Sequence, residues 1–315
     1  MSDVGFFEND FYDLTISALN GFVGNEFNLE VAIKREDQID TFVSGNKFRK
    51  LKYNLIEAQN LRQKTLLTFG GAFSNHIAAT ARAGQRCGFK TIGVIRGEEL
   101  GITLDQTLQQ NPTLKFAYEC GMQFEFVTRK AYREKESAAF NQKLREQFGD
   151  FYFIPEGGTN ALAVKGCKEI LSENTKDFDY IACAVGTGGT IAGIVEASLP
   201  HQKVLGFPAL KGDFLNAEIK KYTSKANWEL INRYHFGGYA KVNEKLVQFI
   251  NDFKKQHGIQ LDPVYTGKMM FGLTDLMRNG FFSKNTRILA VHTGGLQGIA
   301  GMNAKLSKKG YPQII

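Results

Sequence analysis

The sequence predicts an α/β protein with two domains, in which parallel β-sheets carry helices on both faces. Short apolar strands alternate with helix-like segments from Thr65 onward, which is typical of parallel sheets. Several strands end in glycine- or hydroxyl-rich turns that open a helix. The chain has 315 residues and is 43% hydrophobic, enough for one large domain or two moderate ones. We expect a small domain over 61–151 and a large one formed by 1–60 and 152–315.

The first wave of elements runs from the amino terminus to residue 155. Apolar and β-branched runs predict strands, and apolar residues three or four apart predict helices. We expect an aromatic terminal arm at Phe6, Phe7, Phe11 and Tyr12, strands over 29–33, 65–69, 90–95, 123–127 and 151–155, and helices over 47–63, 75–87, 103–120 and 132–148. In the helix predicted over 47–63, Arg49, Lys50 and Lys52 fall off the apolar stripe and are expected to face solvent.

The second wave repeats the alternation to the end of the sheet. We expect helices over 159–173, 189–197 and 244–255, strands over 180–185, 203–207 and 286–291, and an irregular aromatic segment over 211–238. Neither an internal repeat nor a long linker interrupts this pattern.

The composition argues against several classes of function. The net charge is +7, but lysines and arginines are scattered, which favours small anionic ligands over nucleic acid. The four cysteines form no C-x-x-C and the histidines no H-E-x-x-H, so neither a disulfide nor a metal is expected. The amino terminus does not resemble a signal peptide, and no apolar run approaches membrane length. We therefore expect a cytoplasmic protein.

A glycine turn precedes the helix predicted over 47–63 and puts Lys47 in its first turn. The amino end of a helix carries partial positive charge, which disfavours a protonated amine. A neutral lysine amine is the nucleophile that covalent catalysis on a carbonyl requires. The alternative is an ordinary surface lysine in a basic turn, and the local sequence leaves both interpretations open.

Glycine-containing turns follow three predicted strands, at 70–76, 186–190 and 292–295. In open α/β sheets the carboxyl ends of strands form ligand sites. At 186–190, backbone N–H groups, a helix dipole and two threonine hydroxyls favour an anion. Ile191 takes the last glycine position of a dinucleotide fingerprint, and no Walker lysine follows. The loop thus indicates a single phosphate, with an ordinary glycine turn as the alternative. Ser74 is expected to cap the helix over 75–87, and His76 to be structural.

Together these segments resemble the D-cysteine desulfhydrase and 1-aminocyclopropane-1-carboxylate (ACC) deaminase family. This family belongs to the fold-type II, or tryptophan-synthase-β-like, enzymes that use pyridoxal 5′-phosphate (PLP). The matching segments keep the family's order between about residues 31 and 300: Lys34-Arg35-Glu36-Asp37, Gly45-Asn46-Lys47 with Arg49-Lys50-Leu51, Ser74-Asn75-His76, the loop 186–190, Asp262-Pro263-Val264-Tyr265-Thr266-Gly267-Lys268, and His292-Thr293-Gly294-Gly295.

The resemblance implies a role for each matching residue. Lys47 resembles the Schiff-base lysine, Asn75 the asparagine that bonds the ring hydroxyl of PLP, and Ser74 the hydroxyl beside the substrate carboxylate. Gly186, Thr187, Gly188, Gly189 and Thr190 resemble the phosphate cup. Tyr265 and Tyr239 resemble the active-site tyrosines, and Thr266 and Thr293 would line the pyridine-nitrogen end. A small amino-acid substrate and a homodimer are also implied.

Thr266 bears on the choice of substrate. In ACC deaminases the segment that corresponds to 262–268 resembles Asp-Pro-Val-Tyr-Glu-Gly-Lys, with an acid where this chain has Thr266. A neutral hydroxyl leaves a weaker electron sink, adequate for expelling a thiolate. We therefore expect β-elimination from D-cysteine and describe the enzyme as a lyase, a deaminase and a hydrolase. Phe73 stands where the family usually has Gln, so the identity of the substrate amino acid stays open.

Three alternatives stand beside this prediction. One is an ACC deaminase or another D-amino-acid deaminase. The second is a PLP-binding protein without catalysis, and the third a nucleotide binder of the Rossmann type, against which the incomplete glycine fingerprint counts.

Overall fold

A computed structural model describes residues 3–7, 14–21 and 28–315. Phe11 and Tyr12 of the predicted terminal arm lie outside the described residues. Phe7 is fully buried, and its ring centre lies 4.7 Å from that of Phe48. This part of the arm therefore packs onto the first long helix, as predicted.

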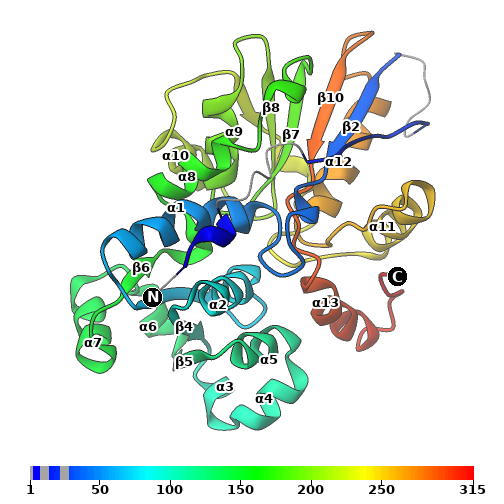
Figure 1. The fold of residues 1–315 in the computed structure, drawn as a ribbon. Helices are drawn as coiled ribbons and strands as arrows, with labels where there is room; N and C mark the ends of the chain where they lie inside the picture. The colour runs from blue at the N-terminus through cyan, green and yellow to red at the C-terminus, as the bar shows by residue number, and fades with distance from the viewer. Residues whose placement is uncertain (1–2, 8–13, 22–27) are drawn as a thin grey trace.

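Two sheets form the centre of the molecule (Figure 1). The larger has six strands in the order β1-β2-β10-β7-β8-β9, and β1 is antiparallel to β2 while the other pairs are parallel. The smaller is wholly parallel, in the order β5-β4-β3-β6. The strands are β1 Ile16–Ala18, β2 Glu30–Lys34, β3 Thr65–Gly71, β4 Lys90–Arg96, β5 Met122–Val127, β6 Tyr152–Ile154, β7 Tyr180–Val185, β8 Lys203–Pro208, β9 Trp228–Leu230 and β10 Arg287–Val291.

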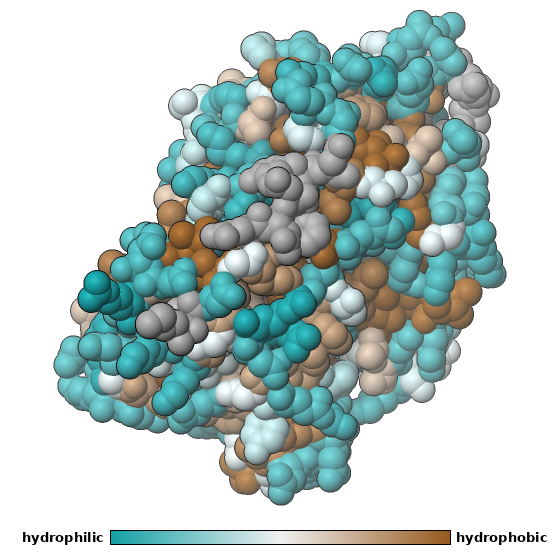
Figure 2. Space-filling model, viewed as in Figure 1, coloured by the Kyte–Doolittle hydropathy of each residue, from teal (hydrophilic) through white to brown (hydrophobic). Residues whose placement is uncertain are grey.

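Helices cover both faces of each sheet. Alternate residues of β7 and β8 enter two separate cores: Ala182 and Leu205 pack with α11 and α12, whereas Ile181 and Val204 pack with α8 and α9. The helices are α1 Asn46–Asn60, α2 Asn75–Cys87, α3 Glu99–Ile102, α4 Leu104–Gln110, α5 Pro112–Glu119, α6 Arg129–Arg133, α7 Ala138–Phe148, α8 Ala161–Lys168, α9 Gly189–Ala197, α10 Phe214–Lys220, α11 Glu244–His257, α12 Thr266–Arg278 and α13 Gly298–Ser307. The face drawn in Figure 2 is accordingly mostly hydrophilic.

The helix over 75–87 and the strand over 180–185 have the predicted bounds. Several other predicted elements were wrong. The helix expected over 103–120 is two helices, because Pro112 begins α5 and Asn111 caps it. Proline lacks an N–H group and is tolerated in the first turn of a helix but not in its interior. The helix expected over 132–148 divides into α6 and α7, and the segment over 211–238 contains α10 and β9.

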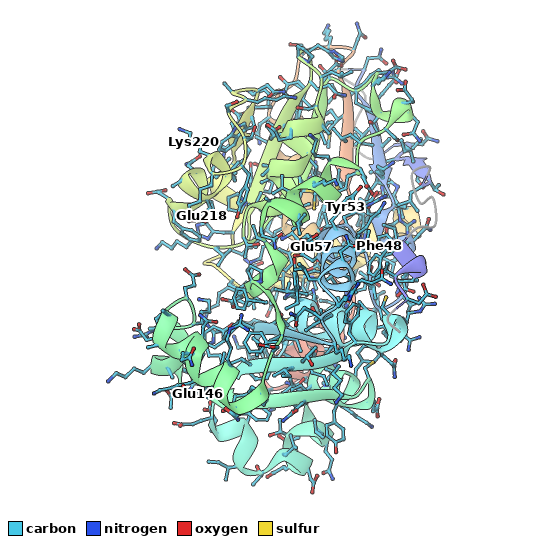
Figure 3. All side chains as sticks on the ribbon, turned by 60° about the vertical axis from the view of Figure 1, so that its left-hand side comes forward. Phe48, Tyr53, Glu57, Glu146, Glu218 and Lys220 are labelled. Atoms are coloured by element: carbon cyan, nitrogen blue, oxygen red, sulfur yellow. The ribbon has the colours of Figure 1, made fainter. Side chains whose placement is uncertain are left out.

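The expectation that Arg49, Lys50 and Lys52 face solvent was also wrong. Figure 3 shows α1, with Phe48, Tyr53 and Glu57, in the middle of the molecule between the two sheets. Arg49 forms a two-bond ion pair with Glu36, and Lys52 pairs with Glu169 at 2.9 Å. The three cations can be buried because neighbouring segments cover α1 and supply oxygen partners, which are carboxylates for Arg49 and Lys52 and neutral oxygens for Lys50.

The small domain was expected to end at residue 151. Strand β6, over 152–154, lies after that residue but pairs with β3 of the small sheet. Within the described part of the chain, no helix has the length and apolar character needed to cross a membrane.

Candidate functional site

Most of the predicted site residues line one cavity at the carboxyl ends of strands from both sheets, and Gly189 and Thr266 do not. The inner part lies between α1 and the loop 186–190, which joins β7 to α9. The outer part has a volume of about 880 Å³ and continues past Ser74 and Tyr239. Lys47, Asn75, Thr187 and Tyr265 line both parts. This is the location at which open α/β sheets bind ligands.

Lys47 is the second residue of α1, immediately after the helix start at Asn46, and its side chain is half-buried. Its Nζ has no hydrogen-bond partner among the described residues, which leaves the amine free to react. Burial, assisted by the nearby charge of Lys50, lowers the pKa of Lys47 to about 7, while Cys167 acts in the opposite direction. The predicted neutral amine thus has a physical cause beyond the helix dipole.

The lowered pKa predicts how fast the amine captures an aldehyde. Between about pH 6 and about pH 8 the amine changes from mostly protonated to mostly neutral, so attachment of PLP to the apoprotein should accelerate about tenfold and then level off. Stopped-flow absorbance measures the rate. The matched control is Nα-acetyl-lysine, whose free side-chain amine titrates near 10.4. Its rate of reaction with PLP should show no levelling in this pH range. A rate that keeps climbing in the protein as well would contradict the assigned pKa.

The loop 186–190 has the geometry of an anion cup. Gly188 has φ +87°, a left-handed conformation that favours glycine, and it caps α9. A Cβ on Gly189 would lie 2.8 Å from Cγ2 of Thr159. Thr190 Oγ1 accepts a hydrogen bond from Asn46 Nδ2 at 2.9 Å. Free backbone N–H groups at a helix start, with no side chains in the way, suit a phosphate.

Lys50 is a site residue that the sequence analysis missed. Its Nζ donates to Gly157 O at 3.0 Å, to Thr159 Oγ1 at 2.8 Å and to Thr187 Oγ1 at 3.3 Å. Burial lowers its pKa, yet the three oxygens hold the ammonium beside the 186–190 loop. Its position one turn after Lys47 was the available signal, because residues three apart share a helix face.

Replacing Lys50 with glutamine should weaken binding of PLP about 10- to 100-fold, because a charge-assisted contact to a phosphate is lost. Fluorescence titration of the apoprotein measures the affinity. The control is Lys168→Gln, an exposed lysine of α8 that lines none of the cavities. Equal affinities for the two variants would exclude Lys50 from the phosphate site.

Asn75 and Ser74 lie at the start of α2. Ser74 Oγ accepts from the backbone N–H groups of His76 and Ile77, so the predicted N-cap is confirmed. Its hydroxyl proton is not used in the cap and can be donated to a ligand in the outer part of the cavity. Asn75 Nδ2 donates to Gly295 O at 3.5 Å, whereas its buried Oδ1 has no partner among the described residues. His76 is buried, and its Nε2 lies 2.8 Å from Thr68 Oγ1.

The two predicted tyrosines both line the outer part of the cavity and contact each other edge to face, with ring centres 6.2 Å apart. Burial, together with Tyr239 and Asp262, raises the pKa of Tyr265 well above its usual value. The pKa of Tyr239 is also raised, chiefly by desolvation of its hydroxyl group, although the residue as a whole is 46% exposed. Both phenols therefore stay protonated near neutral pH and can donate hydrogen bonds.

The two predicted threonines differ in position. Thr293 lines the inner cavity. Thr266 is fully buried at the start of α12 and is absent from that lining. Its hydroxyl donates to Asp262 Oδ2 at 2.7 Å and accepts from the Asp262 N–H at 2.9 Å. Its role toward the cofactor remains a prediction.

These residues fit PLP. The unpartnered Asn75 Oδ1 can accept a bond from the ring hydroxyl, the 186–190 loop and Lys50 can hold the phosphate, and the Lys47 amine can bind the aldehyde. When bound, PLP supplies an electron sink for charge that develops on the α-carbon of an amino acid.

Comparison with known proteins supports the same cofactor. The family model "Pyridoxal-phosphate dependent enzyme" matches residues 16–294. A putative ACC deaminase of Thermotoga maritima is 32% identical over 90% of this chain and 94% of its own. A bifunctional D-cysteine desulfhydrase/ACC deaminase of Arabidopsis thaliana is 30% identical over 86% of this chain and 73% of its own. The crystal structure of an ACC deaminase homologue has a TM-score of 0.76 at 29% identity, and covers 94% of this chain and 93% of its own.

The predicted fold class, cofactor and family resemblance are confirmed, but the description as a hydrolase was wrong. The desulfhydrase activity named for these relatives is a lyase reaction, because elimination and not attack by water breaks the carbon–sulfur bond. The chain belongs to the family of pyridoxal-phosphate dependent enzymes and is a PLP-dependent enzyme homologous to ACC deaminases and D-cysteine desulfhydrases.

Proposed function

We propose that this enzyme eliminates sulfide from D-cysteine and forms pyruvate and ammonia. The observation that carries the proposal is the lining of the inner cavity. Among the described residues this lining includes the hydroxyl residue Thr293 but no aspartate or glutamate. A relative with both activities in its name supports the reaction class.

The missing carboxylate matters because it would keep the pyridine nitrogen protonated and strengthen the electron sink. Asp262 cannot take this part, since its oxygens accept the N–H groups of Val264, Tyr265 and Thr266. Opening the ring of ACC breaks a carbon–carbon bond without a leaving group, whereas a thiolate departs readily. A neutral environment therefore favours elimination from cysteine over ring opening.

The chain's own residues would then orient the substrate and move one proton. The neutral Lys47 amine takes the proton from the α-carbon. Ser74 would donate a hydrogen bond to the substrate carboxylate, since its oxygen accepts at the start of α2 and its proton is not used there. Tyr265 stays protonated beside it and would help to orient the substrate together with Tyr239. The Cβ–S bond breaks, and the sulfur keeps both electrons as it leaves.

The location and assembly of the enzyme are also part of the proposal. We infer a cytoplasmic homodimer from the family resemblance and from cysteines that are all unpaired. Size-exclusion chromatography with light scattering measures the assembly directly.

The test of the function is a panel of D-cysteine, L-cysteine, D-serine and ACC with the PLP-loaded enzyme. Release of pyruvate and sulfide, fastest from D-cysteine, is the expected result. A four-carbon 2-oxo acid formed fastest from ACC would overturn our argument from the inner cavity. A visible cofactor band without turnover of any compound would favour a non-catalytic PLP-binding protein.

A further inference from the structure

Beyond Lys47 the cavity opens into a space much larger than cysteine requires. Its volume of about 880 Å³ lies in the range of roughly 300–1,000 Å³ that holds drug-sized ligands. A second cavity of about 630 Å³ adjoins it and shares Phe73, Arg96 and Glu156 in its lining. We call these two cavities the outer chamber. It lies between the carboxyl ends of β3 and β4 and helix α13, which packs beside α5 (Figure 1).

The charge of the outer chamber is strongly positive. The acids in its lining are already paired, Glu99 with Arg129 at 2.6 Å and Glu156 with Lys135 at 3.4 Å. Other cations in the lining have no carboxylate partner among the described residues: Arg96, Arg133, Lys241, Lys305, Lys308 and Lys309. A cleft lined by one sign of charge concentrates ligands of the opposite sign.

Arg96 is the cation best placed to bind such a ligand. It is the last residue of β4 and lines both cavities of the outer chamber. Its neighbour across the sheet is Gly71, and a Cβ there would come within 3.6 Å of Arg96 Nη2. The guanidinium carbon lies 5.7 Å from the ring centre of Tyr132. Arg96 is exposed to the chamber, and an arginine can bind a carboxylate or sulfonate through two hydrogen bonds.

Two further residues complete the surroundings of Arg96. Tyr132 is buried, and its hydroxyl has no partner within hydrogen-bonding geometry among the described residues, although it faces Glu156. Its phenol is directed at the Glu156 carboxylate and adds a polar group to the same wall. Phe73 contributes an apolar surface, and Lys305 Nζ lies 4.9 Å from its ring centre.

We propose that the enzyme acts on amino acids whose β-sulfur carries an anionic group, which Arg96 binds in the outer chamber. This inference rests on the proposed function and names its substrate class. With S-carboxymethylcysteine, the α-proton passes to the Lys47 amine and the Cβ–S bond breaks. The sulfur retains the electron pair and leaves as mercaptoacetate, and the three-carbon remainder takes up one water to end as pyruvate and ammonia.

The test compares S-carboxymethylcysteine with S-carbamoylmethylcysteine, each as both enantiomers, with the PLP-loaded enzyme. The two compounds have nearly the same shape and differ in one negative charge. We expect kcat/KM to be at least about tenfold higher for the carboxylate, and the preference to shrink as salt is added. Calorimetric titration with both compounds measures binding independently of turnover.

Variants assign the preference to Arg96. Arg96→Gln should reduce the ratio of carboxylate to carbamoyl substrate about 10- to 100-fold, and Arg96→Lys should retain part of it. The matched control is Arg278→Gln, an exposed arginine of α12 that lines neither cavity, and it should retain the full ratio. Circular dichroism verifies that each variant is folded.

The outcomes separate this inference from the proposed function. Turnover of D-cysteine without any preference for the carboxylate compound, in rate or in binding, would overturn the inference alone. An unchanged ratio in Arg96→Gln would overturn the part assigned to Arg96. Preferred binding of the carboxylate compound without turnover of any amino acid would support the chamber and overturn the proposed function.

Discussion

Replacing Lys47 with alanine is expected to lower turnover by roughly a thousandfold or more, because the variant loses both the covalent attachment point and the base. The amine lies at the start of α1, at the junction of the inner and outer cavities, with a pKa of about 7. Steady-state kinetics measures the loss. Borohydride reduction of the wild-type enzyme followed by peptide mapping should locate the modified residue at position 47.

The control for this prediction is Lys47→Arg, which keeps a positive charge but lacks a nucleophilic amine. It should lose activity as severely as the alanine variant, and both should still bind PLP without a bond that borohydride can reduce. A modified peptide that contains another lysine, or substantial activity in either variant, would refute the role of Lys47.

Replacing Glu36 with alanine is expected to lower the free energy of unfolding by about 3–5 kcal/mol. Glu36 accepts from Arg49 Nε at 2.8 Å and from Nη2 at 3.1 Å, and both side chains are almost completely buried. Removal of one partner leaves the other charge in a poorly solvated environment. Urea denaturation of the apoprotein measures the change.

The matched control is Glu99→Ala, which removes the partner of Arg129 at the surface, where the two side chains are 49% and 68% exposed. This change should cost much less than the loss of Glu36, because solvent screens an exposed pair. Exchange of both buried partners, Glu36→Leu with Arg49→Met, should recover most of the loss. If the two alanine variants lowered the free energy of unfolding equally, burial of the Glu36–Arg49 pair would not increase its contribution to stability.

Local patterns were sufficient to predict much of this fold. The strand over 180–185 and the helix over 75–87 have apolar spacing that neighbouring residues determine, and both have the predicted bounds. Lys47, Asn75 and the 186–190 loop lie beside turns at strand ends, which a parallel sheet brings to one edge. Such features are encoded within a few residues of the chain.

Features that depend on distant partners were not predictable in this way. Arg49 and Lys52 are polar in the sequence, and only the folded chain brings Glu169 within reach of them. The outer chamber likewise joins Arg96 of β4 to Lys305 of α13 across two hundred residues of sequence. Helical spacing identifies an apolar stripe but cannot reveal whether the opposite face meets water or a second charged layer.

The central location of α1 has one consequence for experiments with this enzyme. The helix that carries Lys47 packs against α8 on one side and α2 on the other. Any opening of either half of the molecule should therefore disturb the environment of the bound vitamin. Its visible absorbance should then report the integrity of the whole chain, and heating should bleach the colour together with the loss of ellipticity.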